Sequence, residues 1–169
     1  MNRNSKHKST KGFIQIDLAF VILIFFILFL TIHNLNKSNI TGYEYQFEKN
    51  KLNMQARDIC LLITSTPGEP QDWENKTFNQ TKLLGLRETS NNSLSSNKIN
   101  KLKTQTYLNI TDKFNTNSYI NIKIKGLETN TNYLKINADT QNKTIRTGNY
   151  VCYSNYNSEI VEVLIETWK

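Results

Sequence analysis

The sequence predicts an α+β protein: a long N-terminal helix followed by a small globular head, which contains a second helix and a four-stranded antiparallel sheet. Three patterns support this prediction. An unbroken apolar run near the N-terminus leads into apolar residues at helical spacing, and a second such stripe follows near the middle of the chain. The last third alternates apolar and polar residues, as strands with one buried face do.

The apolar run from Leu18 to Leu30 predicts a membrane-spanning helix. Twelve of its thirteen residues are Leu, Ile, Val or Phe. The wider segment Phe13–Ile32 has twenty residues, and a helix of that length spans roughly 30 Å, the thickness of a bilayer's hydrocarbon core. The run favours insertion by about 4–7 kcal/mol, whereas one Asp at mid-membrane costs about 2.5–3.5 kcal/mol and less near an end. The segment is therefore expected to insert despite Asp17.

The helix is predicted to continue to about Thr64. A polar stretch ends at Gly42, where the helix can bend or fray. Thr66-Pro67-Gly68 then stops it, because proline cannot continue a helix and glycine permits a turn. The apolar residues of this second half recur every three to five positions and should face a partner surface: Tyr43, Phe47, Leu52, Ala56, Ile59 and Ile63.

The remaining elements of the head follow from the pattern after residue 66. Ser95 or Ser96 is expected to cap the second helix, whose apolar stripe extends from Ile99 to Phe114. The lysines of this helix should form a solvated face: Lys98, Lys101 and Lys103. Polar turns separate four strand-like segments, which we expect to form an antiparallel meander with one face on the helices. These segments are Ile120–Ile124, Tyr133–Ile136, Ile145–Tyr153 and Val161–Trp168.

Length and charge limit the classes of protein to be considered. The segment His33–Lys169 has about 137 residues, enough for one domain with its own core. The formal charge is +7, but four of the 21 basic residues lie within residues 1–12, where there is no acid. The other 17 stand against 14 acidic residues, a net charge of +3, so nucleic acid is not indicated as a partner. The basic N-terminal segment predicts a cytoplasmic N-terminus and an external C-terminal domain.

The two cysteines, Cys60 and Cys152, would meet oxidising conditions in an exported domain. We therefore favour a disulfide between them. The alternative is two buried thiols, which behave as small hydrophobic side chains.

The octet Lys11–Leu18, with the apolar run behind it, resembles the processing site of type IV prepilins. In that family a short basic leader ends in glycine, and a membrane-embedded aspartyl peptidase cuts after it. The mature chain often begins with Phe, and its fifth residue is an acid. The resemblance implies that Gly12 is the last leader residue, Phe13 is the new N-terminus and Asp17 is the acid at the fifth position.

This resemblance has two departures from the usual pattern. The family more often has Glu where this chain has Asp17. Archaeal members often have Gln directly after the cut, but a chain beginning at Gln15 would have Ala19 in the place of the acid. We therefore expect the cut after Gly12. The stretch from Leu61 to Leu86 and the ending Val163–Lys169 also resemble a group of archaeal pilin-like membrane proteins.

Cleavage would explain the acid near the apolar run. It creates an ammonium group on Phe13 at the edge of an apolar region, and the carboxylate of Asp17, one helical turn along, can neutralise that group in its own chain or in a neighbour. Because unpaired charge there is costly, the pair would reward correct axial register between subunits. The alternative is an interfacial acid without a role.

Seven sequons of the form Asn-x-Ser/Thr occur in the chain. About four would be expected by chance from the abundance of Asn, Ser and Thr. Because archaeal filament subunits are often N-glycosylated, the resemblance implies that several are used. Those at Asn36 and Asn39 lie close to the membrane and are the poorest candidates. The others are at Asn75, Asn79, Asn91, Asn109 and Asn142.

No pattern points to catalysis or to a cofactor. The only histidines are His7 and His33, outside the head, so the head has no histidine for Ser-His or Cys-His nucleophilic schemes. No Cys/His cluster has zinc-ligand spacing, and no glycine-rich phosphate loop is present. We therefore expect no enzyme, no metal and no cofactor.

These observations predict four parts: a leader (1–12), a transmembrane and filament-core helix (13–32), its amphipathic continuation (33–66) and an extracellular head (67–169). The predicted function is a structural subunit of an archaeal type IV pilus-like filament, anchored by one span until assembly. The implied partners are a prepilin peptidase, other pilin subunits, an assembly platform with its ATPase, and membrane lipid. Two alternatives stay open: an uncleaved single-pass binding or adhesion protein, and a minor pseudopilin of a secretion or pilus machine.

Overall fold

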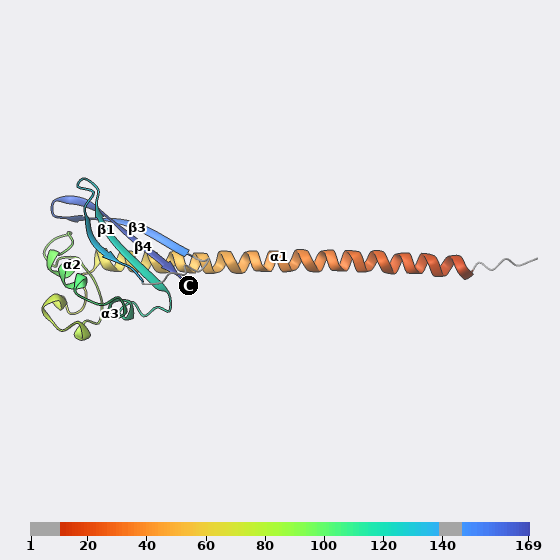
Figure 1. Cartoon of the computed structure of the whole chain (residues 1–169), viewed down its shortest axis with the longest axis horizontal. Helices are drawn as coiled ribbons and strands as arrows, with labels where there is room; N and C mark the ends of the chain where they lie inside the picture. Colours follow the sequence, from red (N-terminus) through yellow and green to blue (C-terminus); the bar gives the residue numbers. More distant parts are fainter. Residues whose placement is uncertain (1–10, 139–146) are drawn as a thin grey trace, which may run out of the picture. The chain divides into compact units, whose positions relative to one another are not determined.

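The computed structural model describes residues 11–138 and 147–169, without the side chains of residues 11–16, 38, 39 and 41 (Figure 1). It confirms the α+β class, with a long N-terminal helix and a four-stranded antiparallel sheet. The chain divides into two compact units, which meet between Glu44 and Tyr45. The helices are α1 (Lys11–Ser65), η1 (Trp73–Asn75), η2 (Phe78–Gln80), α2 (Ser96–Lys103) and α3 (Tyr107–Asp112). The strands are β1 (Tyr119–Gly126), β2 (Asn132–Ile136), β3 (Thr147–Tyr156) and β4 (Glu159–Trp168).

The helix α1 is continuous through Gly42 and ends just before Thr66-Pro67-Gly68, as predicted. Its predicted apolar stripe is only partly correct. Tyr43 and Phe47 are exposed, and the stripe is buried from Leu52 onward. The sheet covers the helix from that point, since a Cβ on Gly148 of β3 would lie 2.4 Å from the backbone carbon of Leu52.

The four predicted strands are present, but the predicted meander is wrong. The strand order is β2-β1-β4-β3, with antiparallel pairing throughout, so two hairpins are joined through β1 and β4. The two central strands have the most regular apolar alternation, and their inward side chains are fully buried. The strands β2 and β3 lie at the two edges of the sheet. The inward face of the central strands consists of Ile120, Ile122, Ile124, Val161, Val163 and Ile165.

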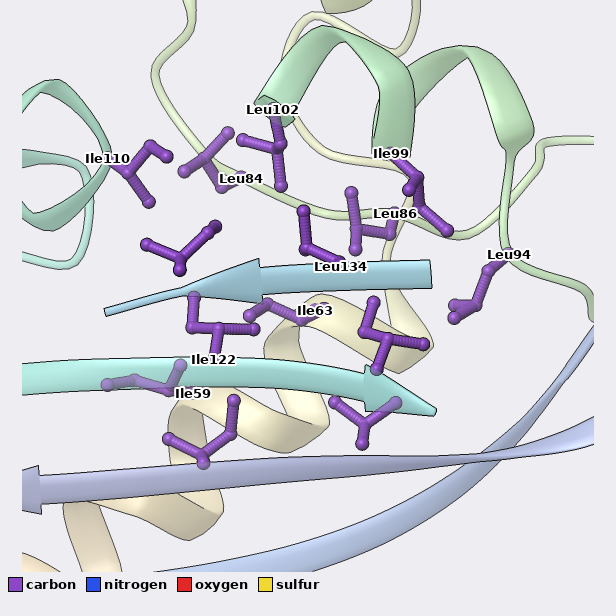
Figure 2. Packing of buried hydrophobic residues seen from close by; sticks show 14 of the residues in the cluster. Ile59, Ile63, Leu84, Leu86, Leu94, Ile99, Leu102, Ile110, Ile122 and Leu134 are labelled. Carbon is purple, nitrogen blue, oxygen red and sulfur yellow. The ribbon is translucent and has the colours of Figure 1, made fainter. Parts of the chain in front are cut away.

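The core of the head lies between this face of the sheet and the helices. Side chains from α1, α2, α3, the sheet and the segment 84–94 converge in it (Figure 2). The loop after α1 is anchored by Trp73, which is buried and donates its indole N–H to the carbonyl of Gly85 at 2.9 Å. Gly68 allows this approach: it has a φ of +87°, and a Cβ there would lie 2.7 Å from the Trp73 ring.

The second predicted helix is divided into α2 and α3. Residues 104–106 interrupt it, because the hydroxyl of Thr104 donates to the carbonyl of Lys101 and that of Thr106 accepts from the N–H of Asn109 at the start of α3. The expected solvated face is wrong for one lysine. Lys98 is only 2% exposed, and its Nζ donates to the carbonyl oxygens of Pro67 (2.6 Å) and Arg87 (3.1 Å). It thereby ties α2 to two separate points of the segment between α1 and α2.

A buried carboxylate joins the turns of the two hairpins. Glu159, at the start of β4, accepts hydrogen bonds from the Tyr133 hydroxyl and from the backbone N–H (3.2 Å) and hydroxyl (3.0 Å) of Thr129. Gly126 leaves room for it, since a Cβ there would lie 2.6 Å from both carboxylate oxygens. The hydrogen bond from Tyr133, followed by those from Thr129, lowers the pKa of Glu159 below its ordinary value of 4.5.

The lowered pKa makes a prediction for acid unfolding. A group with a depressed folded-state pKa stabilises the fold above pH 4.5, and this contribution is lost as the pH falls through the folded-state pKa. We expect Glu159→Gln to be less stable than the parent at neutral pH and to lose less stability below pH 4.5. Urea unfolding over a pH series measures this. Glu128→Gln, an exposed acid of the same turn, is the control. An unchanged acid dependence in Glu159→Gln would contradict the assignment.

Candidate functional site

The apolar segment of α1 is exposed around its whole circumference. Its large side chains from Leu18 to Leu30 are 48–64% exposed. Among the described residues it is the one stretch long and apolar enough to cross a membrane, by length and composition, and none of it is buried within the structure. A helix that is apolar on every side needs an apolar surrounding. That surrounding is either lipid or other helices of the same kind.

The polar side chain of Thr31, at the end of this segment, is hydrogen-bonded within the helix. The hydroxyl of Thr31 donates to the carbonyl of Ile27 at 2.8 Å, which keeps it compatible with an apolar environment. Phe25 and Phe29 stack on one side, with ring centroids 6.5 Å apart, and His33 continues the same row at 6.5 Å. The aromatic row thus extends one turn past the apolar run and ends at a polar residue, as at a membrane–water boundary.

The predicted processing site lies in the first turns of α1. Gly12 and Phe13 are helical in the backbone, and the exposed Asp17 follows Phe13 by four residues. At 3.6 residues per turn, these two positions lie one turn apart on the same side of the helix. The spacing is therefore suitable for an interaction between a carboxylate and an amine at position 13. The predicted leader, apart from Lys11 and Gly12, is outside the described residues.

The predicted disulfide is confirmed. Cys60 of α1 and Cys152 of β3 form it, with their Cα atoms 6.3 Å apart and a sequence separation of 92. Cys60 is fully buried at the centre of the helix–sheet contact. The alternative of two free thiols is therefore wrong. The bond joins the helix to an edge strand, which has one strand neighbour in the sheet, β4.

The structure describes four of the five favoured sequons, and the asparagines of all four are exposed. Asn75 lies in η1, Asn79 in η2, Asn91 in the loop before α2 and Asn109 in α3. The Asn91 side chain oxygen accepts the backbone N–H of Ser93, two residues on, at 3.0 Å. Asn142 lies outside the described residues. These positions are accessible to modification, which stays a prediction.

The burial of the Lys98 side chain was not predicted from the sequence. Burial lowers its pKa, and the nearby acids Glu74, Glu88 and Asp72 oppose that shift. They line an open hollow beside it together with Gln71 and Ser95. Because the amine of Lys98 already donates hydrogen bonds to two carbonyls, we interpret it as a structural link and not as a nucleophile. Its burial could have been expected from its spacing of four residues from Leu102, because positions i and i+4 lie on the same face of a helix.

Comparison of the chain with protein-family models, with curated proteins and with solved structures finds no match in any of the three. Within the residues that the structure describes, no group of three or more His, Cys, Asp or Glu side chains is placed to hold a metal ion. The functional proposal below is based on the apolar helix and on the predicted processing site at Gly12, Phe13 and Asp17.

The disulfide predicts a measurable contribution to stability. Removing both sulfurs with Cys60→Ala and Cys152→Ala should lower the free energy of unfolding by about 2–4 kcal/mol, because a cross-link over 92 residues restricts the unfolded chain. Urea unfolding of the two proteins measures the difference. The parent protein under reducing conditions is the control, as it keeps both side chains. If reduction left the stability of the parent unchanged, this account of the bond would be wrong.

Proposed function

We propose that this chain is a structural subunit of a type IV pilus-like surface filament, processed by a prepilin peptidase and assembled through its N-terminal helix. The observation that supports this most directly is the exposed apolar helix directly after Gly12, Phe13 and Asp17. The basic leader would stay in the cytoplasm while the head lies outside the membrane. After cleavage, the helices of many copies would leave lipid and pack together.

Packing between copies would provide the apolar surrounding that the segment needs. Lipid tails are as apolar as Leu and Phe, so leaving lipid brings little hydrophobic gain, and close van der Waals contact together with polar pairing has to stabilise the bundle. The Asp17 carboxylate and the new amine of Phe13 supply such a pair. Because a charge left without its partner is costly in this environment, only one axial register between neighbours is favoured. Identical contacts repeated head-to-tail without closing then produce an open helical filament.

The second candidate function is a membrane-anchored binding protein that never polymerises. The observation that favours it is the compact unit of residues 45–169, which joins the head to the end of α1 and has its own core and disulfide. In this function lipid alone would surround the apolar segment, and residues 1–12 would stay attached. A minor pseudopilin would share the cleavage with the leading proposal but would be scarce in filaments.

The first test concerns cleavage after Gly12. We expect Gly12→Leu to leave the precursor uncut, because a bulky side chain replaces the small residue that the peptidase requires in the proposed mechanism. Intact-mass measurement of the protein from its native membrane shows whether residues 1–12 are present. Gly42→Leu, the same change at an exposed position of α1, should be processed normally. Maturation of Gly12→Leu to a Phe13 N-terminus would overturn the proposal.

The second test concerns Asp17. The Asp17→Asn variant should be cleaved normally, yet the yield of sheared filaments should fall by about tenfold or more, since ~1.4 kcal/mol lost per contact changes association tenfold. Quantitative mass spectrometry of the sheared fraction measures the yield. Asp17→Glu keeps the charge and should restore assembly. Normal filament yield from the Asn variant would remove the role given to this carboxylate without affecting the proposed cleavage.

A further inference from the structure

An open hollow lies between the end of α1, the loop before α2 and the edge strand β3. Its volume is about 430 Å³, which is within the range of about 300–1,000 Å³ that is usual for small-molecule sites. Side chains from the loop and the sheet line it together with the end of α1, among them those of Arg87, Asn92, Tyr153, Ser154, Asn155 and Ile160. All of them belong to the compact unit of residues 45–169. We call it the Arg87 hollow.

The loop that carries Arg87 is attached to both neighbouring elements. The backbone N–H of Arg87 donates to the carbonyl of Thr66, just after α1, at 3.1 Å. The backbone N–H of Leu94 donates to the carbonyl of Asn155 in β3 at 2.8 Å. The hollow between loop and strand is therefore formed before any ligand arrives, and binding requires little ordering of the protein.

The guanidinium of Arg87 is held in place by neutral acceptors. It donates through Nη1 to the carbonyl of Ser65 at 3.2 Å and through Nε to the carbonyl of Asn91 at 3.4 Å. A third hydrogen bond joins Nη2 to the side chain oxygen of Asn92. A guanidinium has five N–H groups, so one on Nη1 and one on Nη2 stay available for a ligand. The three bonds fix the orientation of the group without neutralising its charge.

Arg87 has no acidic partner in the part of the chain that the structure describes, since neither of the ion pairs found there includes it. The adjacent acid Glu88 lines the other hollow, beside Lys98. Glu162, opposite Tyr153 on β4, is not among the residues that line the Arg87 hollow. Among the described residues that do line it, Arg87 alone is charged. Such a hollow favours an anion, and a carboxylate can accept both remaining N–H groups.

The wall opposite Arg87 combines apolar surface with free polar groups. Tyr153 is 61% exposed and Ile160 is 51% exposed, so together they offer an apolar surface that includes an aromatic ring. Within the described ranges, the side chains of Tyr153, Ser154 and Asn155 make no hydrogen bond. They supply a phenol, a hydroxyl and an amide, which can both donate and accept. The ligand should therefore carry an apolar face and several hydroxyl groups besides its anionic group.

We propose that the Arg87 hollow binds a carboxylate-bearing sugar, that is, a uronic acid residue. The guanidinium of Arg87 binds the carboxylate through two charge-assisted hydrogen bonds. The ring of Tyr153 packs against the apolar face of the sugar ring, and burial of both surfaces contributes to affinity. The side chains of Ser154 and Asn155 form hydrogen bonds with its hydroxyl groups.

The structure favours a sugar acid over an acidic peptide or a simple anion. An extended peptide would need the lane beside β3, and the chain's own Ser93–Leu94 backbone already occupies that lane at Asn155. A simple anion would use Arg87 but leave the exposed ring of Tyr153 and the free polar side chains without partners. A uronic acid has one carboxylate, several hydroxyls and an apolar ring face, so it uses both walls of the hollow.

Binding does not depend on cleavage after Gly12, so this test is separate from those of the proposed function. Full-length protein in phosphatidylcholine nanodiscs is titrated with glucuronic acid, and saturation-transfer NMR measures binding. Glucose, which has a hydroxymethyl group in place of the carboxylate, is the matched neutral probe. We expect glucuronic acid to bind about tenfold or more tightly than glucose and than acetate. Equal binding of glucose or acetate, tighter binding of the peptide acetyl-Ala-Ala, or no binding of glucuronic acid would overturn the proposal.

Variants locate the site. Arg87→Gln should weaken binding of glucuronic acid by about tenfold or more and leave glucose unaffected, whereas Arg57→Gln, the same change at an exposed arginine of α1, should bind like the parent. Because Arg87 also holds the end of α1, Tyr153→Ala is the second variant. It removes an exposed side chain and should weaken binding of both sugars, with Tyr43→Ala as its control. Far-UV circular dichroism and the intact disulfide verify folding. Parent-like binding by folded Arg87→Gln or Tyr153→Ala rejects the site.

Discussion

The structure depends on one constraint: the apolar residues of α1 from Leu18 to Leu30 are exposed on every side of the helix and must be kept from water. Nothing within the structure buries them. A lipid bilayer meets this constraint for a single chain, and a bundle of identical helices meets it for an assembly. Both solutions tolerate few polar groups. A carboxylate at the edge of the run is therefore the feature that, in the proposed function, would distinguish a subunit from a simple anchor.

The second half of α1 meets a different constraint, because the head covers only one of its faces. Residues from Leu52 to Ile63 are buried at helical spacing, and the disulfide from Cys60 attaches the edge strand β3 to the same face. The helix therefore needs no change of secondary structure where its surroundings change. Amphipathic sequence replaces all-round apolar sequence along one continuous element. The head and the part of α1 from Tyr45 onward form one compact unit with a common core.

Local sequence patterns predicted most of the helices and strands. The contacts between residues distant in sequence were not predicted. Periodicity located α1, the four strands and the stop at Pro67, since these depend on side chains close in sequence. In a meander β3 would pair with β2, whereas here β4 pairs with both β1 and β3. The order depends on contacts across the whole head, which the alternation of apolar and polar residues does not encode. The burial of Lys98 was missed for a similar reason: its partners, the carbonyls of Pro67 and Arg87, come from a distant loop. The predicted processing site is different in kind, because a peptidase would recognise a short contiguous stretch.

The error in strand order has a consequence for the surface of the protein. In the predicted meander, β3 would lie between β2 and β4, with both sides paired and no free edge. In the observed order β2-β1-β4-β3 it has one open side, and its uncharged sequence becomes exposed. A sequence that is unremarkable in a central strand is thus an unprotected edge here. Asn53 and Leu94 cover the two ends of this edge, so the contacts that protect it come from residues distant in sequence and follow from the topology, not from any motif.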